Sequence, residues 1–216
     1  MSADRAPPDT APAPDWLALG DSYTIGEGVA ADARWPVQLA RALRAEGLAV
    51  GEARIVAATG WSTDELAAAV ESADPAPGQA LVSLAVGVND QYRGRSVAQF
   101  DAGLAALLAR AVELAGRRPG RVFMLTIPDW GTTPFALASG RDVGAIAREL
   151  DAYNGCIAAR CAAAGIACID VTAAGRAAAG SPGMLADDGL HPSAAAYADW
   201  TQRMLPVVRA LLRGAP

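Results

Sequence analysis

The chain has 216 residues, of which 52% are hydrophobic and 19% are charged, and its formal net charge is −5. This length is sufficient for one domain with its own hydrophobic core, and the composition is typical of a globular rather than a disordered protein. The negative charge gives no indication of nucleic acid or an anionic membrane as a partner.

The N-terminal residues are rich in proline and lack the apolar segment of a signal peptide. We predict a disordered tail over residues 1–14, followed by a single domain over residues 15–216. No apolar run reaches the roughly 18 residues that a membrane span needs, so we expect no membrane partner. A cytoplasmic protein is expected, unless a signal peptide has been removed.

Five apolar runs of strand length follow one another along the chain. They cover residues 15–20, 53–58, 80–87, 121–127 and 166–171. Each run is nearly continuous in apolar residues, which is typical of parallel strands buried on both faces.

Amphipathic stretches of helical length alternate with these runs. Apolar residues recur in them at i, i+3, i+4 and i+7, and they cover residues 34–47, 62–72, 96–116, 142–165 and 193–212. Because strands and helices alternate, we predict an α/β fold with a doubly wound parallel sheet of five strands and helices on both faces. Functional residues of such sheets gather at the carboxyl ends of the strands.

Nucleotide and metal sites find little support in the sequence. Residues 26–31 match a dinucleotide-binding fingerprint, but they begin several residues after the first apolar run ends, whereas that fingerprint opens directly from its strand. A P-loop is excluded because the chain has no lysine. The single histidine and the cysteine spacing fit no zinc pattern. We therefore expect neither a cofactor nor a metal.

A serine nucleophile is better supported. A serine hydroxyl needs an adjacent general base, which a third group must hold in place. The only histidine, His191, is the only candidate for that base, and Ser22 follows the first predicted strand. Asp188 lies three residues before His191 in “DGLHP”, within reach of the imidazole across one turn. Asp187, four residues away, is the competing carboxylate.

Each of these candidates also has a purely structural interpretation. Ser22 could cap a helix, and Gly60 could serve only for a positive φ. Asn89 and the residues before His191 could simply form turns. Their common placement favours a functional role over a purely structural one, because Ser22, Gly60 and Asn89 follow the first three strands. The segment with Asp188 precedes the last helix, and a doubly wound sheet brings these loops to one edge.

The sequence resembles the SGNH hydrolases, also called GDSL esterases/lipases, in four short blocks that occur in the family's order. The blocks are “GDSYTIGEG”, with Tyr23 where the family name has leucine, Gly60 in “ATGWST”, “GVND” at residues 87–90 and “DGLHP” at residues 188–192. The stretch “IPDWGTTPFA” is also similar to one in bacterial members. The resemblance implies a flavodoxin-like, three-layer α/β/α sandwich. It also implies hydrolysis of an ester or thioester without a metal or cofactor.

The same resemblance implies roles for individual residues. Ser22 would be the nucleophile, His191 the general base and Asp188 its orienting partner. The oxyanion donors would be the backbone N–H groups of Ser22 and Gly60 and the side-chain amide of Asn89. Losing one such donor typically lowers kcat by about 10²–10³.

The α/β-hydrolase fold uses the same triad, but its serine lies mid-chain in G-x-S-x-G. Here the residues around Ser22 read “GDSYT” near the N-terminus, so that fold is not favoured. Asp21 is expected to hold its own loop rather than to join the chemistry.

Aromatic residues near the active edge are candidates for a substrate pocket: Tyr23, Trp61, Tyr92 and Trp130, with Trp35 and Phe135 nearby. They could line an apolar or sugar-stacking pocket or pack in the core. No long lid is evident, so short-chain acyl esters or acetylated carbohydrates are the expected small-molecule substrates. An acyltransferase or thioesterase with the same triad, and a non-catalytic ligand-binding module, are the alternatives. The sequence gives no indication of an oligomeric state.

Overall fold

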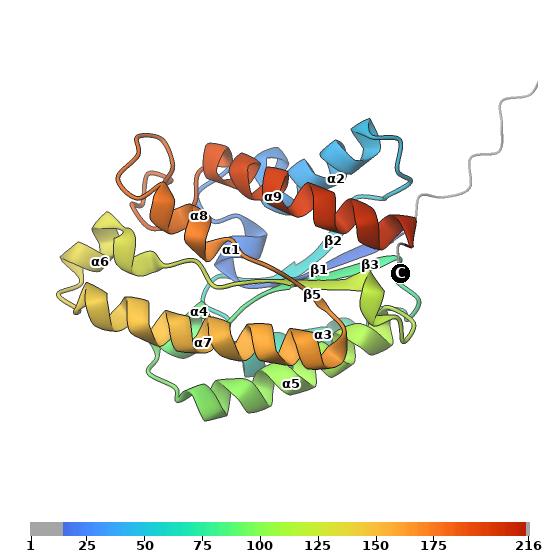
Figure 1. Cartoon of the computed structure of the whole chain (residues 1–216), viewed down its shortest axis with the longest axis horizontal. Coiled ribbons are helices and arrows are strands. Elements are labelled where there is room, and N and C mark those ends of the chain that lie inside the picture. The colour runs from blue at the N-terminus through green and yellow to red at the C-terminus, as the bar shows by residue number, and fades with distance from the viewer. Residues whose placement is uncertain (1–14, 215–216) are drawn as a thin grey trace, which may run out of the picture.

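Five parallel strands form one sheet through the centre of the molecule (Figure 1). The computed structural model describes residues 15–214, so the predicted tail over residues 1–14 lies outside the described residues. The strands are β1 (Trp16–Gly20), β2 (Ala53–Ala57), β3 (Leu81–Ala85), β4 (Val122–Leu125) and β5 (Ala167–Ile169). Their order is β2-β1-β3-β4-β5, which is the doubly wound, flavodoxin-like order. The predicted fold class is confirmed.

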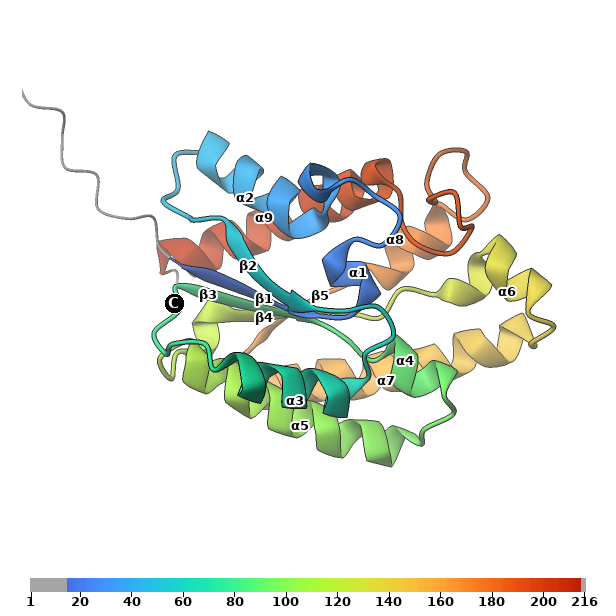
Figure 2. The ribbon, with the colours of Figure 1, turned by 180° about the vertical axis from the view of Figure 1, so that it is seen from behind.

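Helices cover both faces of the sheet, as Figures 1 and 2 show. One face carries α2 (Trp35–Ala45), α8 (Thr172–Ala177) and α9 (Ala194–Arg213). The opposite face carries α3 (Thr63–Ala73), α5 (Val97–Leu114) and α7 (Val143–Ala164). The longer helices and all five strands agree with the predicted ranges to within a few residues at each end.

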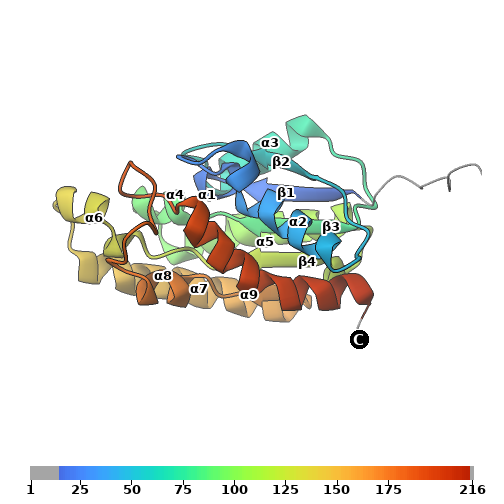
Figure 3. The ribbon, with the colours of Figure 1, turned by 90° about the horizontal axis from the view of Figure 1, so that it is seen from above.

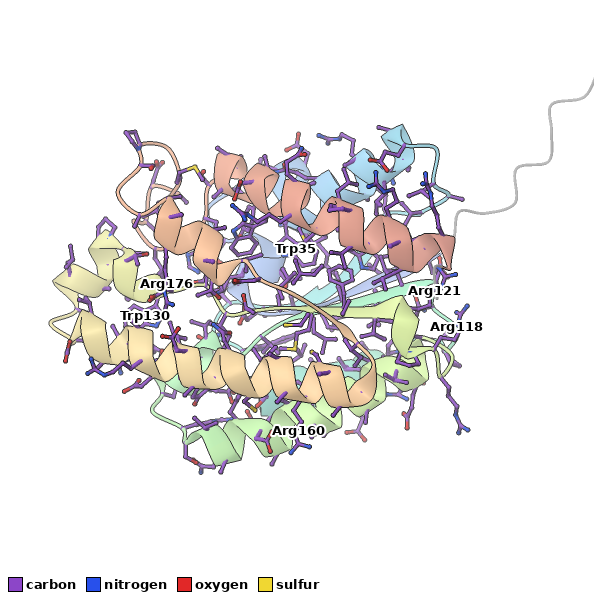
Figure 4. All side chains as sticks on the ribbon, viewed as in Figure 1. Trp35, Arg118, Arg121, Trp130, Arg160 and Arg176 are labelled. Atoms are coloured by element: carbon purple, nitrogen blue, oxygen red, sulfur yellow. The ribbon has the colours of Figure 1, made fainter. Side chains whose placement is uncertain are left out.

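The core lies between the sheet and these helices. Every residue of β1, β3 and β4 is buried, which explains why their sequences are apolar without alternation. Trp16, Trp35 and Phe123 pack together with ring centroids 6.0 to 6.4 Å apart. Trp35 therefore belongs to the core and not to a substrate pocket, and Figure 4 shows it between the sheet and the helices above it.

Short helices gather at the carboxyl ends of the strands. They are α1 (Ser22–Ile25), α4 (Val88–Tyr92) and α6 (Pro134–Ala138), and α8 begins at the same edge. Figure 3 shows α1, α4 and α6 at one end of the molecule, away from the C-terminus. Single 3-10 turns occupy Ala31–Ala33, Pro119–Arg121 and Trp130–Thr132. All of these elements are too short to show a helical period in the sequence. Ser22 and Asn89 lie in α1 and α4, whereas Pro119–Arg121 precedes β4 at the opposite end of the sheet.

Within residues 15–214, no helix combines the length and the apolar character that crossing a bilayer requires. The same part of the chain contains no group of three or more His, Cys, Asp or Glu side chains placed to hold a metal ion.

Candidate active site

Ser22 begins α1 directly after β1. Asp21 caps this helix, because its Oδ1 accepts a hydrogen bond of 3.0 Å from the backbone N–H of Tyr23. Gly20 permits the sharp turn, since a Cβ there would lie 2.1 Å from Thr24 Oγ1 and 2.5 Å from the Ala85 carbonyl oxygen. As the first residue of α1, Ser22 has a backbone N–H without an intrahelical acceptor.

Asp188 and His191 are joined within one turn before α9. His191 Nδ1 lies 2.6 Å from Asp188 Oδ2, and Asp188 Oδ1 accepts from the backbone N–H groups of Leu190 and His191 at 2.9 Å each. Burial opposes ionisation of Asp188, but these hydrogen bonds outweigh it and hold the pKa of Asp188 below its ordinary value. The competing carboxylate, Asp187, is exposed to solvent. The structure therefore places an ionised carboxylate against the imidazole.

Gly28 lies against the Asp188 turn, a role that the sequence analysis did not assign to it. It follows α1 with a φ of +77°, and a Cβ there would lie 2.7 Å from the Ala186 side chain and 3.8 Å from Asp188 Oδ2. Gly26, with a φ of +72°, ends α1. The glycines that resembled a dinucleotide fingerprint thus turn the chain and let it approach the Asp188 turn. Because they lie about 160 residues away from that turn in the sequence, no local pattern predicted this contact.

Ser22 and His191 line one cavity of about 210 Å³, together with Gly60 and Asn89. The segments after β1, β2 and β3 and the loop before α9 therefore meet at this cavity, as the rule for doubly wound sheets predicts. Among the described residues, Ser22 Oγ has no hydrogen-bond partner. Catalytic hydrogen bonds are often long in ligand-free enzymes and tighten when substrate binds.

Gly60 and Asn89 supply polar N–H groups to this cavity. One N–H of the Asn89 amide donates to the Trp61 carbonyl oxygen at 2.9 Å, which leaves the second free to donate elsewhere. The backbone N–H of Gly60 has no acceptor among residues 15–214. Gly60 has a φ of +86° with no atom within 4 Å of a Cβ, so its conformation rather than its packing requires glycine.

Charged side chains hold the Gly60 loop against α4. Asp90 is fully buried and accepts from the Thr63 N–H at 3.0 Å and the Thr63 hydroxyl at 2.8 Å. Burial raises the pKa of Asp90 above its ordinary value, although the bonds from Thr63 and the charge of Arg95 oppose this. Arg93 donates to the Gly60 carbonyl at 2.7 Å and to Glu65 at 2.8 Å. These contacts join residues about 30 positions apart and were not evident in the sequence.

Three of the four predicted pocket aromatics line the cavity: Tyr23, Tyr92 and Trp130. The Tyr23 ring packs edge-on against His191, with centroids 5.6 Å apart. Trp61 is not among the lining residues; its side chain packs against the hydrophobic core. For Trp61 the structure shows the core packing that the sequence had left open as an alternative, and its backbone carbonyl accepts from Asn89.

Trp130 is held by a polar chain that sequence reasoning missed. Its indole N–H donates to Gln91 Oε1 at 2.8 Å, and Gln91 Nε2 donates to Glu149 at 2.6 Å. Figure 4 shows Trp130 beside Arg176 near the start of α7. Arg176 bonds Asp129, the residue before Trp130, at 2.7 Å. The loop after β4 is thus fixed from both sides.

Known proteins resemble this chain in sequence pattern and in fold. The GDSL-like lipase/acylhydrolase family model matches residues 18–198. The lipase/acylhydrolase from Enterococcus faecalis has a TM-score of 0.70 and 20% identity, covering 91% of this chain and 96% of its own. TesA has a TM-score of 0.68 and 23% identity, covering 91% and 99%. Axe2, an acetylxylan esterase from Geobacillus stearothermophilus, has a TM-score of 0.67 and 20% identity, covering 90% and 94%.

At these identities the likeness to solved structures shows the fold alone. No curated protein matches the sequence.

Proposed function

Because the chain belongs to the GDSL-like lipase/acylhydrolase family and is a carboxylic ester hydrolase, we propose that Ser22, His191 and Asp188 are its catalytic triad. The observation that carries the proposal is the 2.6 Å contact between His191 Nδ1 and Asp188 Oδ2, beside the cavity that Ser22 lines. The carboxylate accepts the Nδ1 proton, so Nε2 is the unprotonated nitrogen that can act as a base.

The reaction proceeds in two steps. Ser22 Oγ attacks the carbonyl carbon of the ester while His191 Nε2 takes the hydroxyl proton. The bond to the alcohol oxygen then breaks, and that oxygen leaves with the proton from His191. In the second step His191 takes a proton from water, whose oxygen attacks the acyl group on Ser22. The acid is released, and the proton returns to Ser22.

Charge on the former carbonyl oxygen is stabilised by three neutral donors. These are the backbone N–H groups of Ser22 and Gly60 and the free N–H of the Asn89 amide. All three residues line the cavity, and the hydrogen bond from Asn89 to the Trp61 carbonyl fixes the plane of the amide before substrate binds. Such preorganised donors contribute about 10²–10³ each to kcat.

The substrates are short-chain acyl esters or acetylated carbohydrates. The cavity of about 210 Å³ is smaller than a typical ligand pocket of roughly 300–1,000 Å³, which suits a small acyl group. Tyr92 and Phe135 are 41% and 37% exposed at its rim, where their rings offer a stacking surface. Axe2, which shares the fold, is an acetylxylan esterase.

Covalent labelling with a phosphonate tests this proposal. The esterase EstA from Pseudoalteromonas sp. has the same fold, and one of its structures is of the enzyme inhibited by monoethylphosphonate. We expect a fluorophosphonate to label the wild-type chain once, at Ser22, and to abolish hydrolysis of p-nitrophenyl acetate. The Ser22→Ala variant should show neither labelling nor hydrolysis, whereas the exposed-serine control Ser72→Ala, on α3 away from the cavity, should behave as wild type. Labelling that survives in Ser22→Ala would refute the assignment.

A further inference from the structure

A second and larger cavity adjoins the catalytic one. Its volume is about 380 Å³, and Tyr23, Trp130 and Leu190 line both cavities. The larger cavity is enclosed by the loop after β4, by α8, by the start of α9 and by the loop between these two helices. In Figure 1 that loop lies next to α6 at the carboxyl edge of the sheet. A ligand group could therefore extend from the nucleophile into this space.

The lining of this cavity is mainly apolar. Ala174 in α8 and Ala178 directly after it leave space, and Leu137, Met184 and Leu185 provide larger apolar surfaces. A volume of about 380 Å³ falls within the range of ligand pockets, roughly 300–1,000 Å³. The cavity is therefore suited to an apolar group rather than to a sugar.

The two carboxylates in the lining are both paired. Asp129 lies 2.7 Å from Arg176 Nε, and Asp199 lies 3.0 Å from Arg203 Nε. Asp129 is buried, and its bond to Arg176 ties α8 to the loop after β4. The first pair thus joins two walls of the cavity, whereas the second is an exposed pair within α9.

The position of the cavity indicates which side of an ester it receives. None of the proposed oxyanion donors lines it, whereas Leu190 and Pro192, on either side of His191 in the chain, both do. In the proposed reaction His191 gives its proton to the oxygen of the leaving alcohol. The alcohol group is therefore the substituent that lies on the side of His191, next to the larger cavity.

We propose that the larger cavity binds the alcohol group of the substrate. This narrows the two proposed substrate classes to short acyl esters of extended apolar alcohols and disfavours acetylated carbohydrates. This inference rests on the proposed function. In the first step the bond between the acyl carbon and the alcohol oxygen breaks, that oxygen takes the proton from His191, and the alcohol leaves from the larger cavity. The acyl group stays on Ser22 in the smaller cavity.

Two isomeric esters test whether the larger cavity binds the alcohol group or the acyl group. Hexyl acetate and ethyl hexanoate have the same composition and carry their long chain on opposite sides of the ester. Each methylene removed from water favours binding about fourfold, so we expect kcat/KM for hexyl acetate to exceed that for ethyl hexanoate about tenfold or more. An equal or inverted preference, measured by titration of the released acid, would overturn the inference.

Filling the cavity supplies the second arm of the experiment. Ala178→Trp places an indole in the cavity, while Ala177→Trp, on the neighbouring exposed residue outside the lining, is the control. We expect the ratio of kcat/KM for hexyl acetate over ethyl acetate to fall about tenfold in Ala178→Trp and to stay as in wild type in the control. If Ala178→Trp does not fold, Ala178→Leu replaces it, with a smaller fall in the same direction.

The outcomes distinguish this inference from the proposed function. An unchanged ratio in a folded Ala178 variant, or a selective loss of ethyl hexanoate hydrolysis, would overturn the alcohol assignment while Ser22→Ala remained inactive. Hydrolysis of ethyl acetate by Ser22→Ala would instead contradict the proposed function, and the inference with it.

Discussion

Asp188 and Asp187 are adjacent carboxylates with different surroundings. Both residues are exposed, but Asp188 accepts one hydrogen bond from the His191 ring and two from backbone N–H groups, whereas the Asp187 carboxylate accepts none among the described residues. The chemical role of Asp188 depends on its charge. An asparagine in its place would donate to Nδ1, and the ring proton would then sit on Nε2, the nitrogen that accepts the proton of Ser22 in the proposed reaction.

We therefore expect Asp188→Asn to lower kcat by about 10³–10⁴ with little loss of stability. Asp187→Asn is the matched control and should keep kcat within about twofold, since the Asp187 carboxylate makes no hydrogen bond among the described residues. Steady-state hydrolysis of p-nitrophenyl acetate measures both. Similar losses in the two variants would contradict the pairing of Asp188 with the base.

Ionisation of the buried Asp21 carboxyl lowers folding stability, and the size of this effect depends on pH. Burial raises its pKa to about 7, with a further contribution from the charge of Asp90, although backbone hydrogen bonds oppose the shift. An unfolded Asp has a pKa of about 3.9. Between about pH 4 and pH 7, the folded chain thus keeps a proton that the unfolded chain has lost. Folding stability from this group is greatest below that window and falls as pH rises through it.

Asp21→Asn removes this dependence. The asparagine Oδ1 can still accept from the Tyr23 N–H, but no buried charge forms at high pH. We expect the free energy of unfolding of Asp21→Asn, relative to wild type, to increase between pH 5 and pH 8 by about 2–3 kcal/mol. Urea denaturation at both pH values measures it. A difference that does not change with pH would show that Asp21 is not the titrating group.

At the scale of single residues, the sequence was informative where partners lie close together in the chain. The spacing of Asp188 and His191 predicted a contact that the structure contains. It was uninformative for Gly28, whose neighbour Ala186 is distant in sequence. It left the place of Trp61 open, because nothing in a sequence tells which side of a turn an aromatic ring takes.

The short helices α1 and α4 determine the site at the scale of elements. Each begins where a strand ends and so presents its first residues at the edge of the sheet, Ser22 in α1 and Asn89 in α4. Both are too short for apolar periodicity to reveal. The longer strands and helices were predictable because burial on both faces leaves continuous apolar runs, and burial on one face leaves a helical repeat.

Arg93 connects α4 to the Gly60 loop and α3. Its guanidinium bonds the Gly60 carbonyl and Glu65, so removing it loosens the loop that carries one proposed oxyanion donor. We expect Arg93→Ala to lower kcat about tenfold and to leave KM within about twofold, because a donor acts mainly in the transition state. The rate of fluorophosphonate labelling should fall in parallel.

Arg110→Ala is the control for this prediction. Arg110 is as exposed as Arg93, 41% against 42%, and it pairs with Glu113 on α5. A change in KM alone in Arg93→Ala, or the same effect in both variants, would contradict a positioning role for Arg93.

At the scale of the whole molecule, the residues that stabilise the fold and those of the candidate site lie in different places. The aromatic cluster around Trp35 lies between the sheet and the helices, whereas Trp130 lies at the end where the short helices gather (Figure 4). Arg118 and Arg121 mark the opposite end of the sheet. The alternation of apolar runs and amphipathic stretches predicted this layout. The two neighbouring cavities were not predictable, because they form between loops whose paths depend on tertiary contacts.

The central claim is that Ser22 carries the acyl group between the two steps. The most direct test is to mix the enzyme with p-nitrophenyl acetate, quench with acid within the first turnover, and locate the modified residue by peptide mass spectrometry. The account predicts a burst of p-nitrophenol and a single acetyl group on Ser22. An acetyl group on any other residue, or turnover in Ser22→Ala, would contradict it.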